Sequence, residues 1–258
     1  MIYRELTYFC TAIMFFTRIP IPVKLKYSEE IMNQSQKYFP LVGAIVGGIG
    51  CFVYFVSQLF FSTEISLVIS MISTVLLTGA FHEDGFTDVC DSFGGGYGKE
   101  QIMTIMKDSR IGAYGVIGII LILLLKFLAL NQIAYSSGTL IYAVILNGHI
   151  TSRFQAGTMI FTDLYVTDID KSKSKPLANK KLSYGAFFFT LLTTLIPYFL
   201  FKNWLFLLII PLSHIGKLYL SWYFKKHIGG YTGDCLGTVQ QVCEVLFYLI
   251  VIILWKFM

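Results

Sequence analysis

Residues 111–130 read IGAYGVIGIILILLLKFLAL, an apolar stretch interrupted only by the charge of Lys126. A helix of about 20 apolar residues crosses a hydrocarbon core of about 30 Å. The whole chain shares this character, because 55% of its 258 residues are hydrophobic and only 14% are charged. Its mean hydropathy is +0.68. So few polar side chains cannot cover a water-soluble domain, and the composition predicts a multi-pass integral membrane protein.

Further apolar runs of similar length predict an all-α, polytopic transmembrane helix bundle of about seven spans. The predicted spans are residues 41–61, 65–81, 111–130, 139–161, 184–201, 204–224 and 239–255. A shorter N-terminal stretch repeats apolar residues at helical spacing and predicts an interfacial helix, or one tucked into the bundle. Its apolar positions are Leu6, Phe9, Cys10, Ile13 and Phe16. We expect a single membrane domain over residues 1–258.

The positions of Lys and Arg predict the orientation of this domain. Placing the N-terminal segment 1–40 in the cytoplasm puts residues 82–110, 162–183 and 225–238 on the same side. Fifteen of the twenty cations then lie inside: Arg4, Arg18, Lys24, Lys26, Lys37, Lys99, Lys107, Arg110, Lys171, Lys173, Lys175, Lys180, Lys181, Lys225 and Lys226. The outer side holds Lys202 and Lys256. This bias predicts the cytoplasmic (inner) membrane, with the N-terminus and the active loops in the cytoplasm. The net charge of +5 then favours contact with the lipid bilayer, not with nucleic acid.

The second predicted span runs into residues 81–91, FHEDGFTDVCD. Asp84, Asp88 and Asp91 are spaced i, i+4 and i+7, which places them on one face if the segment is helical. Like charges so close repel, and hard oxygen ligands suit Mg²⁺, with Mn²⁺ as a substitute, so the spacing predicts a metal site. The alternative is an acidic, solvated helix end. His82 either orients an aspartate or acts as a base, or is an interfacial side chain without chemistry.

A second polar segment, residues 106–115 (MKDSRIGAYG), precedes the third predicted span. Arg110 suits bidentate phosphate contact, and Lys107 adds a second cation. The alternative is an ordinary positive-inside anchor. Glycines between the two motifs either let backbone N–H groups approach phosphate or form a plain linker. These are Gly94, Gly95, Gly96 and Gly98. We therefore expect residues 82–110 to form a cytoplasmic catalytic loop.

Residues 225–238 are expected to form a second loop at the active face. Residues 229–237, GGYTGDCLG, combine glycines with one carboxylate, Asp234. Asp234 either completes the metal site or is a turn aspartate.

Ionisable residues inside the predicted spans are costly and usually mark function. They are Arg153, Lys217 and Glu244, with His149 and His214 one turn before the first two. These groups either line a polar cavity that opens to the cytoplasm or form ion pairs that lock helices together. Lys126, near the outer end of its span, is expected to snorkel to the interface.

With these residues the chain resembles the cobalamin-5′-phosphate synthase family, also called adenosylcobinamide-GDP ribazoletransferase. The resemblance is nearly full-length and is carried by five segments: 16–22 (FTRIPIP), 38–43 (YFPLVG), 82–91 (HxDGxxDxxD), 105–112 (IMKDSRIG) and 233–237 (GDxxG). Family members often have an apolar residue in place of Glu83 and a glycine in place of Ser92. Glu83 therefore ranks below the three aspartates as a ligand.

The resemblance implies a Mg²⁺-dependent transferase in the late nucleotide-loop assembly of cobalamin biosynthesis. α-Ribazole, or its 5′-phosphate, joins adenosylcobinamide-GDP and GMP is released. A ribose hydroxyl attacks the cobinamide-bound phosphorus, and such transfers depend on positioning and on neutralising charge. The implied catalytic residues are Asp84, Asp88, Asp91, Asp108 and His82. The implied metal ligands are Asp84, Asp88, Asp91 and Glu83. The implied substrate-binding residues are Lys107, Arg110, Arg153, Lys217 and Asp234. In addition, either Asp108 or Asp234 makes a second metal contact or takes the proton of the attacking hydroxyl. The expected partners of such an enzyme are its two substrates and, in addition, a second copy of the chain or other cobalamin-assembly enzymes.

Two other functions fit parts of the pattern. A CDP-alcohol-type phosphotransferase also places spaced aspartates at a cytoplasmic helix end, but its glycine and Ala-Arg pattern is missing here. A cation transporter needs carboxylates near the bilayer midplane, where this chain has only Glu244.

Overall fold

The computed structural model describes residues 2–23, 25, 28–166 and 183–257. In this part the chain is helical, and its only extended pairing is a β-bridge between Tyr165 and Tyr231. The predicted all-α, polytopic membrane bundle is confirmed. Seven of the cations that predict its orientation lie outside the described residues: Lys24, Lys26, Lys171, Lys173, Lys175, Lys180 and Lys181.

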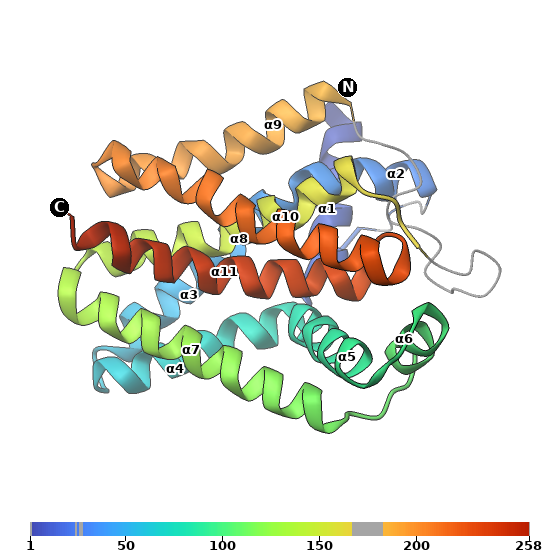
Figure 1. Cartoon of the computed structure of the whole chain (residues 1–258). Helices are drawn as coiled ribbons and strands as arrows, with labels where there is room; N and C mark the ends of the chain where they lie inside the picture. The colour runs from blue at the N-terminus through green and yellow to red at the C-terminus, as the bar shows by residue number, and fades with distance from the viewer. Residues whose placement is uncertain (1, 24, 26–27, 167–182, 258) are drawn as a thin grey trace.

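The long helices run along a common direction, as Figure 1 shows. They are α3 (Phe39–Ser57), α7 (Ala113–Ser137), α8 (Leu140–Thr162), α9 (Tyr184–Leu195) with η2 (Ile196–Phe201), η3 (Trp204–Leu208) with α10 (Ile209–Ile228), and α11 (Gly233–Trp255). The C-terminus lies at one end of the bundle, while α5 and α6 lie at the other (Figure 1).

Five helical segments are long and apolar enough to cross a membrane, and a bent pair brings the number to as many as six in the described part of the chain. The five are Glu29–Ser57, Ala113–Ser136, Tyr184–Phe201, Trp204–Ile228 and Gly233–Trp255. The predicted span 139–161 is a helix of 23 residues, α8, that is not among them. Residues 147–160 of α8 are all buried, so this polar helix forms the centre of the bundle and does not face lipid.

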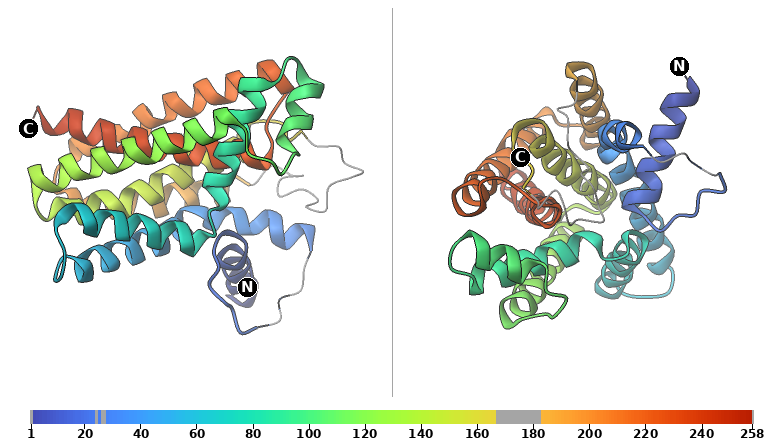
Figure 2. Two further views of the ribbon diagram at one scale, coloured as in Figure 1. Left: turned by 90° about the horizontal axis from the view of Figure 1, so that it is seen from below. Right: turned by 90° about the vertical axis from the view of Figure 1, so that its right-hand side faces the viewer.

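The predicted span 65–81 is wrong at its end. α4 (Thr63–Thr78) stops at Gly79, and α5 (Phe81–Gly95) leaves at 88°. Gly79 and Ala80 both adopt the left-handed conformation, with φ of 69° and 58°, which ends a helix and redirects the chain. A Cβ at Gly79 would also lie 2.4 Å from Arg18 Nε. α5 therefore crosses the end of the bundle nearly at right angles to the long helices (Figure 2, left), and it belongs to none of the five long apolar segments.

The N-terminal helix α1 (Ile2–Phe16) is amphipathic, as the sequence predicts. It buries Tyr8, Ala12, Ile13 and Phe16 against the bundle, whereas Leu6 is exposed. The helices α2 (Glu29–Ser35) and η1 (Gln36–Tyr38) then lead into α3.

The two expected active-face loops are largely helical. α5 and α6 (Lys99–Met106) fill most of residues 82–110, and α10 and α11 leave only residues 229–232 between them. Local capping explains this difference. Gly229 ends α10 at φ 88°, and the Thr232 side chain accepts a 3.3 Å hydrogen bond from the Cys235 N–H at the start of α11.

Candidate active site

The acidic face of α5 forms as the spacing predicts. Because residues 81–95 are helical, Asp84, Asp88 and Asp91 lie on one side of α5. Asp84 is exposed and the other two are half-buried, whereas His82 and Glu83 turn inward and are buried. The three aspartates therefore face the end of the bundle, and the two neighbouring polar residues face its interior.

Asp234 meets this face because two helices approach closely at glycines. A Cβ at Gly85 would lie 2.9 Å from Asp234 Cα, and one at Gly237 would lie 3.1 Å from the His82 carbonyl oxygen. The Thr238 hydroxyl adds a 3.3 Å hydrogen bond to the Gly85 carbonyl. The glycine that follows Asp84 thus allows α5 to pack against the first turn of α11.

The pKa of Asp88 shows that the charges of the other three carboxylates act on it. Burial, followed in order of size by the neighbouring charges of Asp234, Asp84 and Asp91, raises the pKa of Asp88 to about 7. Within the described residues, no three His, Cys, Asp or Glu side chains are grouped closely enough to hold a metal ion as they stand. The donors are all hard carboxylate oxygens, the type that Mg²⁺ takes, so the residues fit the ion chemically. The metal site stays a prediction.

Asp91 connects the two central sequence motifs. Its carboxylate oxygens accept hydrogen bonds from the N–H groups of Gly112 and Gly115, both at 2.7 Å. A Cβ at these glycines would lie 2.4 Å and 2.3 Å from the same carboxylate. Asp91 therefore holds the N-terminus of α7, where unpaired amides and the helix dipole favour an anion.

The basic segment after α6 lies on the surface. Arg110 is exposed and pairs with Asp108 at 2.7 Å, and this hydrogen bond lowers the pKa of Asp108 to about 2. Lys107 ends α6 and is also exposed. Both cations can therefore be reached by a ligand from the surrounding water.

The other predicted substrate-binding cations lie elsewhere. Arg153 is 1% exposed and donates to the His149 carbonyl at 3.1 Å. Lys217 is buried and pairs with Asp163 at 3.2 Å. The structure thus brings Asp84, Asp88, Asp91 and Asp234 near one another, but it buries these two cations inside the bundle, where Arg153 contacts its own helix α8 and Lys217 contacts the residue that ends α8.

The position of Lys126 differs from the sequence prediction, and three polar residues that contact buried charges were not predicted. Lys126 does not snorkel, because it is 3% exposed and its Nζ lies 2.6 Å from Glu244 Oε1. These residues are Asp163, which pairs with Lys217, and the neighbouring Gln240 and Gln241 of α11, which donate hydrogen bonds to Glu244 and Glu83. Polar residues within the apolar run of α11 were the available signal for the two glutamines.

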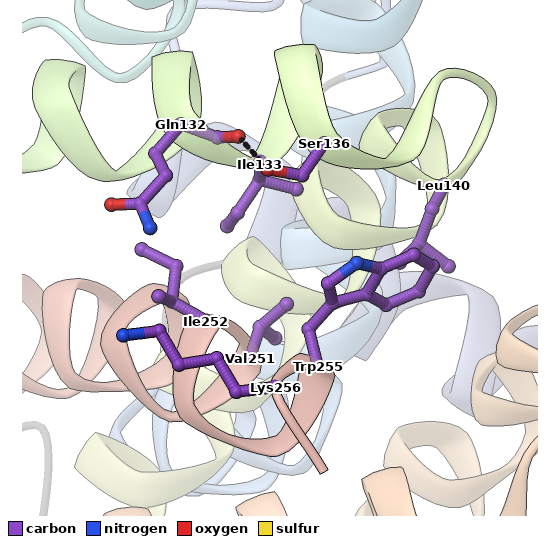
Figure 3. Close-up of a pocket in the computed structure, with 8 residues that line it drawn as sticks. All are labelled: Gln132, Ile133, Ser136, Leu140, Val251, Ile252, Trp255 and Lys256. Carbon is purple, nitrogen blue, oxygen red and sulfur yellow. Dashed lines mark hydrogen bonds between the residues drawn. The ribbon is translucent and has the colours of Figure 1, made fainter. Parts of the chain in front are cut away.

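A pocket of about 130 Å³ lies near the C-terminus (Figure 3), whereas α5 lies at the other end of the bundle (Figure 1). Its lining comes from α7, α8 and α11: Gln132, Ile133, Ser136, Leu140, Val251, Ile252, Trp255 and Lys256. None of the predicted site residues contributes to it.

The fold and the site define a multi-pass membrane protein that gathers four carboxylates and exposed cations at one end of its helices. Residues 8–252 match the family described as Cobalamin-5-phosphate synthase. The chain belongs to this family.

Curated relatives agree with this assignment. The chain is 42% identical to the adenosylcobinamide-GDP ribazoletransferase of Shewanella amazonensis over 253 residues, which are 98% of this chain and 97% of that protein. It is 44% identical to the protein of the same name from Vibrio cholerae over 249 residues, 96% of this chain and 94% of that one. No solved structure matches the chain.

Proposed function

We propose that this enzyme joins adenosylcobinamide-GDP to α-ribazole, or to its 5′-phosphate, and releases GMP. A ribose hydroxyl oxygen forms a bond to the phosphorus next to cobinamide. The bond from that phosphorus to the bridging oxygen breaks, and the bridging oxygen leaves with GMP. The hydroxyl loses its proton. The product is adenosylcobalamin, or its 5′-phosphate. Membership of the family and the full-length relatives support this reaction.

The acidic end of the bundle is the proposed reaction site. The observation that carries this assignment is the environment of Asp88, whose carboxyl is half-buried among the charges of Asp84, Asp91 and Asp234. We assign Mg²⁺ to Asp84, Asp88 and Asp234, while Asp91 holds the α7 N-terminus with its two oxygens. When bound, the ion would neutralise charge on the pyrophosphate.

The exposed segment after α6 would orient the pyrophosphate. Arg110 presents a planar, bidentate donor to phosphate oxygens. Its present partner, Asp108, lies at the surface, so a phosphate group can replace this carboxylate on Arg110. Once released from Arg110, Asp108 is an acceptor for the hydroxyl proton. Asp91 joins this segment to α5, so the anion-binding and acidic parts are fixed relative to each other.

We also propose that the end carrying α5 faces the cytoplasm of the inner membrane. Cations gather at this end in the described part of the chain: Lys99, Lys107, Arg110, Lys225 and Lys226. Lys226 lies 5.2 Å from the ring centroid of Trp222, an arrangement suited to a headgroup region.

The direct test uses purified protein in detergent with adenosylcobinamide-GDP and α-ribazole. GMP and the corrinoid product are followed by chromatography, with Mg²⁺ and with EDTA. We expect equal amounts of GMP and cobamide, both dependent on the metal. Folded protein that forms no product with Mg²⁺ would argue against this reaction and favour another phosphotransfer. Product formation unaffected by EDTA would remove the metal assignment alone.

A further inference from the structure

A chain of buried polar side chains crosses the bundle from α7 to α5. Lys126 pairs with Glu244 at 2.6 Å, and Gln240 donates to the other Glu244 oxygen at 2.7 Å. Gln241 donates to Gln240 Oε1 at 2.8 Å and to Glu83 Oε1 at 2.9 Å. Glu83 is therefore the end of this chain, next to Asp84 on the acidic helix.

A second group of polar side chains approaches the same helix from α8. Arg153 contacts His149 through the carbonyl oxygen at 3.1 Å and Nδ1 at 3.2 Å. Its guanidinium carbon lies 5.9 Å from the ring centroid of Phe39, and the His82 ring is stacked on the same phenyl ring at 5.8 Å. Arg153 thus lies close to the inward side of α5.

Four buried polar atoms that belong to these two groups and to His82 lack a protein partner. They are His82 Nε2, Glu83 Oε2, Arg153 Nε and Gln241 Oε1. Their residues are all at most 9% exposed. Burying a polar atom without a hydrogen-bond partner is costly, so such atoms in a folded protein usually have a partner, which can be an ordered water. Arg153 Nε is a donor, whereas the Glu83 and Gln241 oxygens are acceptors, and the charges of Glu83 and Arg153 interact without a direct ion pair.

We propose that a buried water bridges Arg153 Nε to Glu83 Oε2 and Gln241 Oε1, and that through it Glu83 is a positioning residue for the acidic helix. A water with two to four polar partners is the usual occupant of such a place. The link ties α5 to α8 and α11, and so sets the direction in which Asp84, one residue further on, projects from the end of the bundle. The activity readouts of this proposal rest on the proposed function.

The test compares Glu83→Gln, Arg153→Gln and the double variant. Each single change leaves the buried group formed by Lys126, Arg153, Glu83 and Glu244 with one charge in excess, which is destabilising, whereas replacing both charges keeps the group neutral and is tolerated much better. We expect each single variant to lose yield of monodisperse protein and about tenfold in turnover, and the double variant to recover most of both. Glu64→Gln changes a partly exposed carboxylate outside this group, which accepts a hydrogen bond from the Tyr135 hydroxyl, and is the matched control.

The Mg²⁺ concentration for half-maximal rate separates positioning from plain loss of folded protein. It should rise in Glu83→Gln and return towards the wild-type value in the double variant, because Asp84 is displaced and then restored. Losses that multiply in the double variant, or an unchanged Mg²⁺ requirement in Glu83→Gln, would overturn the proposal. If wild-type protein shows no turnover, the proposed function fails, but recovery of monodisperse yield in the double variant still tests the link between Glu83 and Arg153.

Discussion

The Asp91 carboxylate in α5 accepts a 2.7 Å hydrogen bond from the backbone N–H of Gly115 in α7, two helices further along the chain. This bond makes the end of α5 and the start of α7 one unit. The glycine is required by space, since a Cβ there would lie 2.3 Å from Asp91 Oδ2. Asp91 therefore has a structural task in addition to any contact with metal.

Gly115→Ala should destabilise the protein. The added methyl group pushes the Asp91 carboxylate away from the α7 N-terminus, and loss of such a cap costs about 0.5–2 kcal/mol. Thermal unfolding in detergent should show a lower midpoint. Gly48→Ala is the matched control, because a Cβ at Gly48 meets nothing within 4 Å. An equal midpoint for the two variants would contradict the cap.

Asp88→Asn should abolish turnover and leave membrane insertion intact. The change removes a charge with little change of shape, at the carboxyl on which the charges of Asp234, Asp84 and Asp91 act. GMP release and the amount of membrane-extracted protein are the two measurements. Glu100→Gln, an exposed carboxylate on the neighbouring helix α6, should keep full activity. Full activity in Asp88→Asn would refute the proposed site.

Mg²⁺ should raise the melting temperature of the wild-type protein without substrate. A ligand that binds only the folded state adds about 2.7 kcal/mol at a concentration one hundred times its dissociation constant. Asp234→Asn should reduce this shift, because Asp234 is one of the four converging carboxylates. An unchanged shift in Asp234→Asn would show that α11 contributes no ligand. Glu100→Gln again supplies the control.

Glu244→Gln should destabilise the bundle by about 3–5 kcal/mol, since it leaves Lys126 buried beside a neutral partner. The melting temperature should fall well below that of Glu64→Gln, which alters a partly exposed carboxylate without a buried cation beside it. If both variants melt like the wild type, the Lys126–Glu244 pair contributes nothing to stability.

Much of the architecture follows from local sequence. The apolar runs predict the helices because a bilayer requires about 20 apolar residues per span and satisfies no free backbone polar groups. The spacing of Asp84, Asp88 and Asp91 predicts one acidic face, because helical periodicity is a local property. The structure departs from the predicted spans at residues 79–80, where left-handed backbone ends α4 and redirects the chain into α5, and at α8, whose polar composition reflects burial within protein.

Contacts between distant segments came only from the tertiary structure. Nothing in the sequence places Gly85 against Asp234, or Lys126 against Glu244, because partners more than one hundred residues apart are selected by where helices cross. Local patterns thus determined that this chain is a membrane bundle with an acidic helix and a basic segment. Packing decided which carboxylates converge, which cations are buried in pairs and which remain open to substrate, since these depend on helix crossing points and not on periodicity.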